Sequence, residues 1–240
     1  MTVRGLRLLS ILSVVLVAVG FGLVFFYAPL DTDQGFRQKI FYLHVPLGIV
    51  GLCGFIVAAW HGFRYLRTGD PASDLRAYVY IHMSQIVAVA VLITGGIWGK
   101  TAWGTWWRWD EPFLVSFLFL FLIYATYQVL RFSIDDPQRQ ARAASAFAIA
   151  AGAFVPVNFT VVRMANQYLH PRTLDNAANG GLPGPVLVTF LICFLAIATL
   201  FVTLVRYELL SKSTTFRLRS LERRAGGDDL LPRRSAVLQA

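Results

Sequence analysis

Residues 8–27 read LLSILSVVLVAVGFGLVFFY, a run of twenty residues without a charged side chain. About 20 mostly apolar residues are what a helix needs to cross the hydrocarbon core of a bilayer. The run is long and has no clear small-residue cleavage site after it, so we interpret it as a retained helix and not as a signal peptide. It therefore predicts a first membrane-spanning helix.

The composition of the whole chain supports the same class. Of 240 residues, 56% are hydrophobic and only 15% are charged, against about 25% charged in average soluble domains. We therefore predict an all-α, polytopic membrane protein with six transmembrane helices within residues 1–206, followed by a basic cytoplasmic tail at 207–240. The other five predicted helices span residues 42–63, 77–99, 113–132, 143–162 and 185–206.

The basic residues give the predicted orientation. If the N-terminus is cytoplasmic, 16 of the 22 Lys and Arg residues fall on the cytoplasmic side and six fall outside. The positive-inside rule then places both termini in the cytoplasm. The net charge of +9 comes from basic residues that lie mostly between and beyond the apolar runs. This is the pattern of a membrane topology signal, so we expect no nucleic-acid partner. We expect the tail to begin as a helical extension, to end in disorder and to anchor on anionic lipid.

A tryptophan-rich segment, KTAWGTWWRWDEP at 100–112, falls in the second predicted outer loop. With Trp98, it holds five of the six tryptophans of the chain. An aromatic belt places tryptophan at several helix ends on both membrane faces, and this concentration in one loop is different. If the loop is helical, Trp103, Trp106, Trp107 and Asp110 share one face. Such a shelf suits a flat apolar ligand such as haem.

Histidine is the common axial ligand of haem iron, and the topology sorts the four histidines. His44 lies at the outer end of the second predicted helix and His170 lies in the third outer loop. His61 is about 26 Å from His44 along the helix axis, and His82 also lies towards the cytoplasm. This placement is what ligation of one haem by His44 and His170 across the shelf would need, and a solvated or hydrogen-bonded histidine at the membrane interface is the other interpretation.

The acidic pair that ends the tryptophan segment has a simpler interpretation. Paired carboxylates can transfer protons, but Asp110 and Glu111 directly precede Pro112, and proline is favoured at the first position of a helix. Helix capping is at least as good an interpretation as acid–base chemistry.

At these residues the chain resembles a known family. KIFYLHVP at 39–46, followed by WGKTAWGTWWRWD at 98–110, is similar to the haem-handling proteins of cytochrome c biogenesis with a tryptophan-rich WWD signature. The length and the six helices resemble the CcmC type, the haem exporter protein C family. The resemblance covers roughly residues 8–206.

The resemblance implies a site and a set of partners. CcmC-type proteins of the bacterial inner membrane hold non-covalent, transient haem b at the periplasmic face. They pass it to the haem chaperone CcmE and work with the ABC-transporter subunits CcmA and CcmB and with CcmD. It implies His44 and His170 as axial ligands, and Trp103, Trp106, Trp107, Trp109 and Asp110 as the haem platform.

One departure from the family pattern concerns the haem propionates. The family often has an arginine two residues after the signature aspartate, and this chain has Pro112 there. Guanidinium groups bind carboxylates well, so Arg108 is expected to supply the charge, with Arg163 and Arg172 as other options.

Three alternatives remain open from the sequence. A WWD-type cytochrome c synthase would be an enzyme, but such chains are usually longer. A b-type electron carrier would ligate haem within the bundle. A generic transporter would place polar, broken segments at the membrane midplane. The chain has no CxxCH motif, so it is not itself a c-type cytochrome, and we expect a haem-transfer component and not an enzyme.

Overall fold

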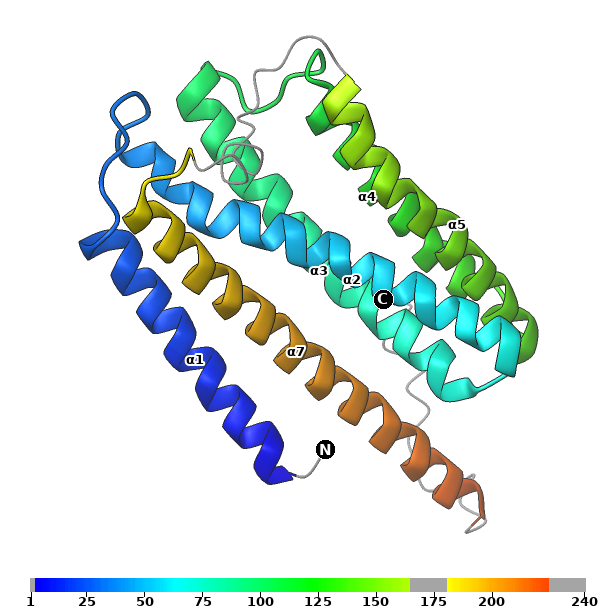
Figure 1. Cartoon of the computed structure of the whole chain (residues 1–240). Coiled ribbons are helices and arrows are strands. Elements are labelled where there is room, and N and C mark those ends of the chain that lie inside the picture. The colour runs from blue at the N-terminus through cyan, green and yellow to red at the C-terminus, as the bar shows by residue number, and fades with distance from the viewer. Residues whose placement is uncertain (1–2, 165–180, 225–240) are drawn as a thin grey trace, which may run out of the picture.

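A computed structural model describes residues 3–164 and 181–224. Among these residues six helices are long and apolar enough to cross a membrane, and no strand is present. The predicted all-α, multi-pass class is confirmed (Figure 1). The helices are α1 Val3–Phe26, α2 Phe41–Thr68, α3 Pro71–Trp103, α4 Pro112–Phe132, α5 Pro137–Met164 and α7 Gly184–Arg224, with a short 3₁₀ helix η1 at Phe36–Ile40.

Helices α2 and α3 form a hairpin with a very short turn. Gly69 ends α2 with φ of 66°, a left-handed conformation that suits glycine. Asp70 caps α3 by accepting a hydrogen bond from the amide of Ala72 at 3.0 Å, and Pro71 takes the first helical position. A hydrogen bond from the hydroxyl of Ser73 is the main reason that the pKa of Asp70 lies below its usual value. This turn fixes α2 and α3 as antiparallel neighbours.

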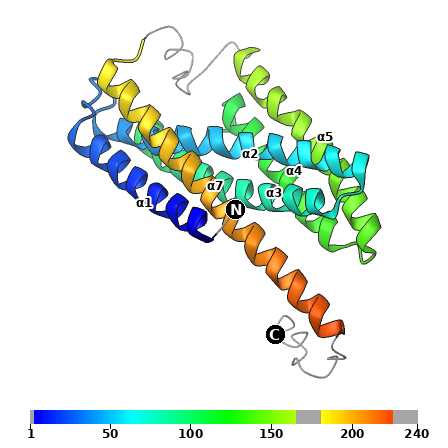
Figure 2. The same cartoon turned by 60° about the horizontal axis from the view of Figure 1, so that its bottom comes forward.

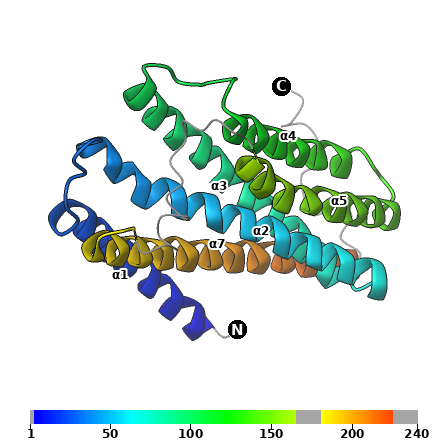
Figure 3. The same cartoon turned by 45° about the horizontal axis from the view of Figure 1, so that its top comes forward.

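Helix α2 lies at the centre of the bundle, with α3, α5 and α7 packed against it. In Figure 3, α4 and α5 lie on one side of α2 and α3, and α1 and α7 lie on the other. Gly54 lets three helices approach, because a Cβ there would collide with Ser84 of α3 and lie 2.7 Å from the ring of Phe201 in α7. Small residues at such crossings are typical of membrane helix packing.

The turns 69–70 and 133–136 lie at one end of the molecule, here called the hairpin end (Figure 1). A partly buried ion pair lies there: Arg131 of α4 donates two hydrogen bonds to Asp74 of α3, at 2.8 and 2.7 Å. The ring of Tyr78 is faced by the guanidinium of Arg131 at 4.9 Å and by Lys212 of α7 at 5.0 Å. These contacts join α3, α4 and α7.

Helix α7 runs for 41 residues and extends beyond the rest of the bundle (Figure 2). It contains no glycine or proline after Pro185, so nothing in its sequence interrupts it. The tail therefore begins as a continuation of α7, as expected, up to Arg224. Its remainder, residues 225–240, lies outside the described residues.

Candidate functional site

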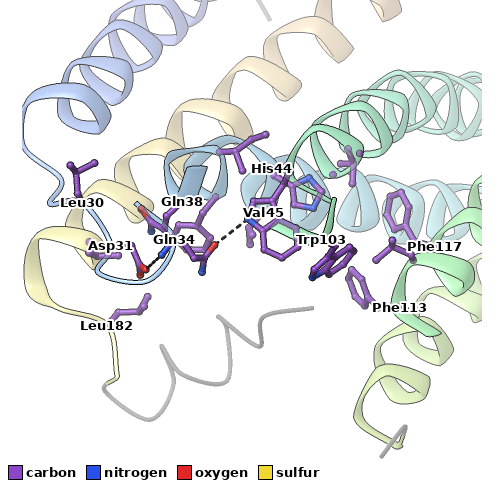
Figure 4. Close-up of a pocket in the computed structure, with 18 of the residues that line it drawn as sticks. Leu30, Asp31, Gln34, Gln38, His44, Val45, Trp103, Phe113, Phe117 and Leu182 are labelled. Atoms are coloured by element: carbon purple, nitrogen blue, oxygen red, sulfur yellow. Dashed lines mark hydrogen bonds between the residues drawn. The ribbon is translucent and has the colours of Figure 1, made fainter. Parts of the chain in front are cut away.

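A cavity opens at the other end of the molecule, here called the tryptophan end, between α2, α3, α4 and the start of α7 (Figure 4). Its volume is about 420 Å³, within the range of about 300–1,000 Å³ that is common for small-molecule sites. Most of its lining is apolar or aromatic. The lining includes Phe41, His44 and Val45 of α2; Val91, Leu92, Gly95, Gly96, Trp98 and Trp103 of α3; Trp107; Phe113, Leu114 and Phe117 of α4; and Leu182, Pro183 and Val186.

His44 is the one histidine among the described residues that line this cavity. Its Nδ1 lies 2.9 Å from the hydroxyl oxygen of Thr94 in α3. Gly95 makes room for the ring, because a Cβ at that position would lie 3.0 Å from Cε1 of His44. Figure 4 shows His44 and Trp103 beside the same space. The predicted ligand His44 is thus held in the wall of a cavity.

Three indoles line the cavity with it: Trp98, Trp103 and Trp107. Trp98 and Trp103 meet edge to face, with ring centroids 4.9 Å apart, an arrangement that aromatic pairs favour. The indole nitrogen of Trp98 donates to Gln34 at 3.1 Å. The indole N–H of Trp107 is buried without a hydrogen-bond partner among the described residues.

The other two tryptophans of the segment are not among the described residues that line the cavity. Trp106 and Trp109 are 60% and 74% exposed. The predicted shared helical face is wrong, because α3 ends at Trp103 and the described chain is not helical again until Pro112. Gly104 causes this break, since it takes the left-handed conformation with φ of 77° and its carbonyl accepts a hydrogen bond from Lys100 at 2.9 Å.

Arg108 and Asp110 form a local pair within the segment. Arg108 donates from Nε to Asp110 at 3.0 Å and makes a second bond to the same carboxylate. This hydrogen bonding lowers the pKa of Asp110 and raises the pKa of Arg108. Neither side chain is part of the described cavity lining. In this structure Arg108 and Asp110 are therefore paired with each other, outside the cavity.

The predicted capping by the acidic pair is only partly right. Pro112 does occupy the first turn of α4 and Glu111 the N-cap position, but the side chain of Glu111 makes no capping hydrogen bond. Instead Glu111 is buried, with 1% of its surface exposed. Asp110 is bound by Arg108.

The described lining contains neither lysine nor arginine. The nearby cations Arg37 and Lys100 donate to the carbonyls of Thr101 and Gly104 at the end of α3, where the helix dipole favours positive charge. Polar groups of the lining come from the loop before α2: Asp31, Thr32, Gln34 and Gln38. Arg163 lies in the last turn of α5, and Arg172 and the predicted ligand His170 lie outside the described residues.

The other two described histidines, His61 and His82, do not line the cavity. The ring of His61 stacks on Tyr80 at 5.8 Å and that of His82 on Tyr78 at 6.0 Å. Among the described residues, no group of three or more His, Cys, Asp and Glu could hold a metal ion. One imidazole among indoles fits a flat ligand that carries its own metal better than it fits a bare ion.

The sequence-based interpretation missed parts of the lining. It assigned no role to Trp98, to the α1–α2 loop or to Phe113 and Phe117 of α4. One signal could have been used: glycines at 95, 96 and 99 lie close together in the third predicted helix, and small residues in spanning helices often mark a close approach. Here they face His44, the main chain of Trp106 and Trp103.

The fold and the cavity define a multi-pass α-helical membrane protein with an aromatic pocket at one end of its bundle. Residues 1–224 match the profile of the family described as CcmC, Heme exporter protein C. The chain belongs to this family.

Named relatives agree with the family match. The Heme exporter protein C of Bradyrhizobium diazoefficiens is 30% identical over 222 residues, which is 92% of this chain and 84% of the relative. That of Haemophilus influenzae is 29% identical over 206 residues, 84% and 82% of the two chains. That of Paracoccus denitrificans is 34% identical over 150 residues, a match that spans 62% of each protein.

Proposed function

We propose that this protein binds haem at the periplasmic face of the bacterial inner membrane and delivers it to the chaperone CcmE for c-type cytochrome assembly. In this role it is a transfer component and not an enzyme. CcmA, CcmB and CcmD are its expected partners, by family membership. The observation that carries the proposal is the imidazole of His44, set among three indoles in a cavity of about 420 Å³ that the described residues line.

The chemistry of the lining supports haem as the cargo. Apolar side chains from α3 and α4 offer burial to a porphyrin face, and the indoles of Trp98, Trp103 and Trp107 offer ring contacts. An imidazole nitrogen is a common axial donor to haem iron. The polar groups of the α1–α2 loop lie along another part of the lining, which suits an amphipathic ligand. His170 remains the proposed second axial ligand.

The propionate partner stays part of the proposal. Arg108 could serve only if it exchanged the carboxylate of Asp110 for that of a propionate. Arg163 and Arg172 are the other two candidates. Substitution of each by glutamine separates the three, because only the true partner should weaken haem binding.

The division of the tryptophans suits transfer. Trp103 and Trp107 line the cavity, whereas Trp106 and Trp109 are exposed beside it. We assign the first two to haem and the exposed two to the surface that meets the chaperone. Exposed aromatic side chains are common anchors at protein interfaces.

The test is an absorption spectrum of the purified protein, produced with and without CcmE, for wild type, His44→Ala and His170→Ala. Wild type should carry non-covalent haem with a two-histidine spectrum. Both variants should lose or alter this spectrum, and the haem found on CcmE should fall in parallel. His61→Ala is the matched control, because His61 lies in the same helix as His44 but outside the cavity.

If His44→Ala and His170→Ala both keep the wild-type spectrum, the axial assignment is wrong. If they lose the haem while CcmE is still loaded normally, the delivery role is wrong. A bound haem that changes redox state reversibly and never reaches CcmE would instead favour the b-type electron carrier.

A further inference from the structure

We propose that Thr94 is the positioning residue that sets the tautomer and orientation of His44, so that Nε2 is the nitrogen presented to haem iron. The inference rests on the proposed function, since it concerns the same site. Thr94 lies in α3 and is not itself among the residues that line the cavity. Metal-bound histidines generally donate their other N–H to an outer partner, which fixes the ring.

The direction of the hydrogen bond follows from the protons available. The hydroxyl of Thr94 has one hydrogen. That hydrogen is directed to the backbone of its own helix, where the carbonyl oxygen of Ala90 lies 2.7 Å away and that of Val91 lies 3.2 Å away. The oxygen of Thr94 is therefore left as an acceptor for the bond of 2.9 Å to His44.

The proton of this bond must then come from the imidazole. Nδ1 of His44 carries the hydrogen and donates it to Thr94, so the neutral ring bears its lone pair on Nε2. A lone pair is what an iron ligand needs. Because Nδ1 carries the hydrogen that it donates to Thr94, it has no lone pair for iron as long as the hydroxyl of Thr94 is bonded to its own helix.

Gly95 completes the constraint. The hydrogen bond to Thr94 holds one edge of the ring, and the missing side chain of Gly95 leaves space for Cε1, which a Cβ would approach to 3.0 Å. Two consecutive residues of α3 thus set the position of a side chain on α2. The packing of α2 on α3 makes this relationship rigid.

The hydrogen bond also has an electronic effect. Donation from Nδ1 makes Nε2 more basic, and a more basic ligand favours ferric over ferrous haem. Removing the acceptor should therefore weaken haem binding and move the midpoint potential to more positive values. A residue that only filled space would change the affinity without a matching change in potential.

The experiment compares full-length wild type with Thr94→Val, Thr94→Ala and Thr94→Ser, by haem titration and by potentiometry of the bound haem. Outer partners of metal ligands typically contribute about 10- to 100-fold in affinity. Thr94→Val and Thr94→Ala should lose haem affinity to about this extent and shift the potential upwards. Thr94→Ser, which keeps the hydroxyl, should restore both properties.

Thr126→Val is the matched control. Thr126 lies in α4 and bonds to the carbonyl four residues earlier, at Leu122, as Thr94 bonds to Ala90, but it lies outside the cavity lining. Its replacement should leave affinity and potential unchanged. Helix content by circular dichroism confirms that each variant folds.

The outcomes separate this inference from the proposed function. If His44→Ala abolishes the haem spectrum but Thr94→Val and Thr94→Ala keep wild-type affinity and potential, the positioning role is wrong and the haem site stands. If Thr94→Ser loses as much as Thr94→Val, the hydroxyl is not the cause and the inference also fails. If His44→Ala changes nothing, both proposals fail together.

Discussion

Two arginine–aspartate pairs lie at opposite ends of the molecule and differ in almost every physical respect. At the hairpin end, Arg131 and Asp74 come from different helices and their side chains are 11% and 16% exposed. At the tryptophan end, Arg108 and Asp110 are two residues apart and their side chains are 34% and 64% exposed. Both are charge-assisted, two-bond contacts.

The difference shows where the bundle is closed and where it is open. The pair at the hairpin end joins α3 to α4 and adds contacts through Tyr78 to α7. The exposed pair joins a loop only to itself and leaves α3 and α4 apart, with a cavity between them. The same two helices are therefore tied at one end and separated at the other, and the ligand pocket lies at the separated end.

The largest effect should come from breaking the partly buried pair at the hairpin end. Arg131→Ala leaves the carboxylate of Asp74 partly buried without its cation, which typically costs about 3–5 kcal/mol of stability. Thermal unfolding in detergent, followed by circular dichroism, measures this. Arg139→Ala is the control, because Arg139 is exposed at the same end, and it should change the stability little.

A second variant tests the origin of that loss. Asp74→Ala combined with Arg131→Ala should recover part of the stability, because it removes the uncompensated charge. A double variant no more stable than Arg131→Ala alone would mean that the ion pair is not what joins the helices.

The next effect concerns the two kinds of tryptophan. Trp103→Ala removes an indole of the cavity wall and should weaken haem binding by at least about tenfold, since buried aromatic anchors often contribute about 2 kcal/mol. Trp106→Ala removes an exposed indole and should leave haem affinity close to wild type. Haem titration of both variants checks this. Equal losses would contradict the assignment of Trp103 to haem.

A smaller effect is expected from one added methyl group. Gly95→Ala places a Cβ about 3.0 Å from the ring of His44 and forces it to move. Overpacking of this kind typically costs about 1–3 kcal/mol of stability of the folded protein. Gly48→Ala is the control, because Gly48 lies in α2 one turn after His44, an added Cβ there meets nothing within 4 Å, and the residue does not line the cavity. Haem affinity should fall for Gly95→Ala and stay close to wild type for Gly48→Ala.

The smallest effect should come from the exposed pair. Arg108 lowers the pKa of Asp110 below its ordinary value of 3.8. The pair is therefore formed above that value and is lost as the pH falls through the lowered pKa. Tryptophan fluorescence during acidification from neutral pH should report this loss, and Asp110→Asn should remove the transition. Neither Asp110→Asn nor Arg108→Gln should change the melting temperature measurably.

The sequence predicted the fold well because the bilayer simplifies the problem. A spanning helix needs a long apolar run, and every such run from residue 8 onwards is a helix in the structure. The helix ends were less accurate. We expected the third helix to end at residue 99, but it runs to Trp103, because polar and aromatic residues can continue a helix beyond the apolar run until Gly104 stops it.

The site was only partly predictable. His44 could be found because its family motif and predicted place in the membrane agreed, and it does line the cavity. Trp98, Thr94 and Gly95 depend on how α2 packs against α3, which no local pattern contains. Which indoles line the cavity was also hidden, because the chain leaves the helix at Gly104, and beyond that point no helical spacing tells that Trp107 lines the cavity and Trp106 is largely exposed.

The unbroken course of α7 has a mechanical consequence. One helix carries Val186 on the cavity wall and Lys212 on the ring of Tyr78, and these residues are about 39 Å apart along its axis. A helix without a hinge transmits tilt as displacement. A rotation of about 3° about the Lys212 contact would move Val186 by about 2 Å over that length. A small change in the tilt of α7 at the hairpin end would therefore displace the wall of the pocket at the tryptophan end.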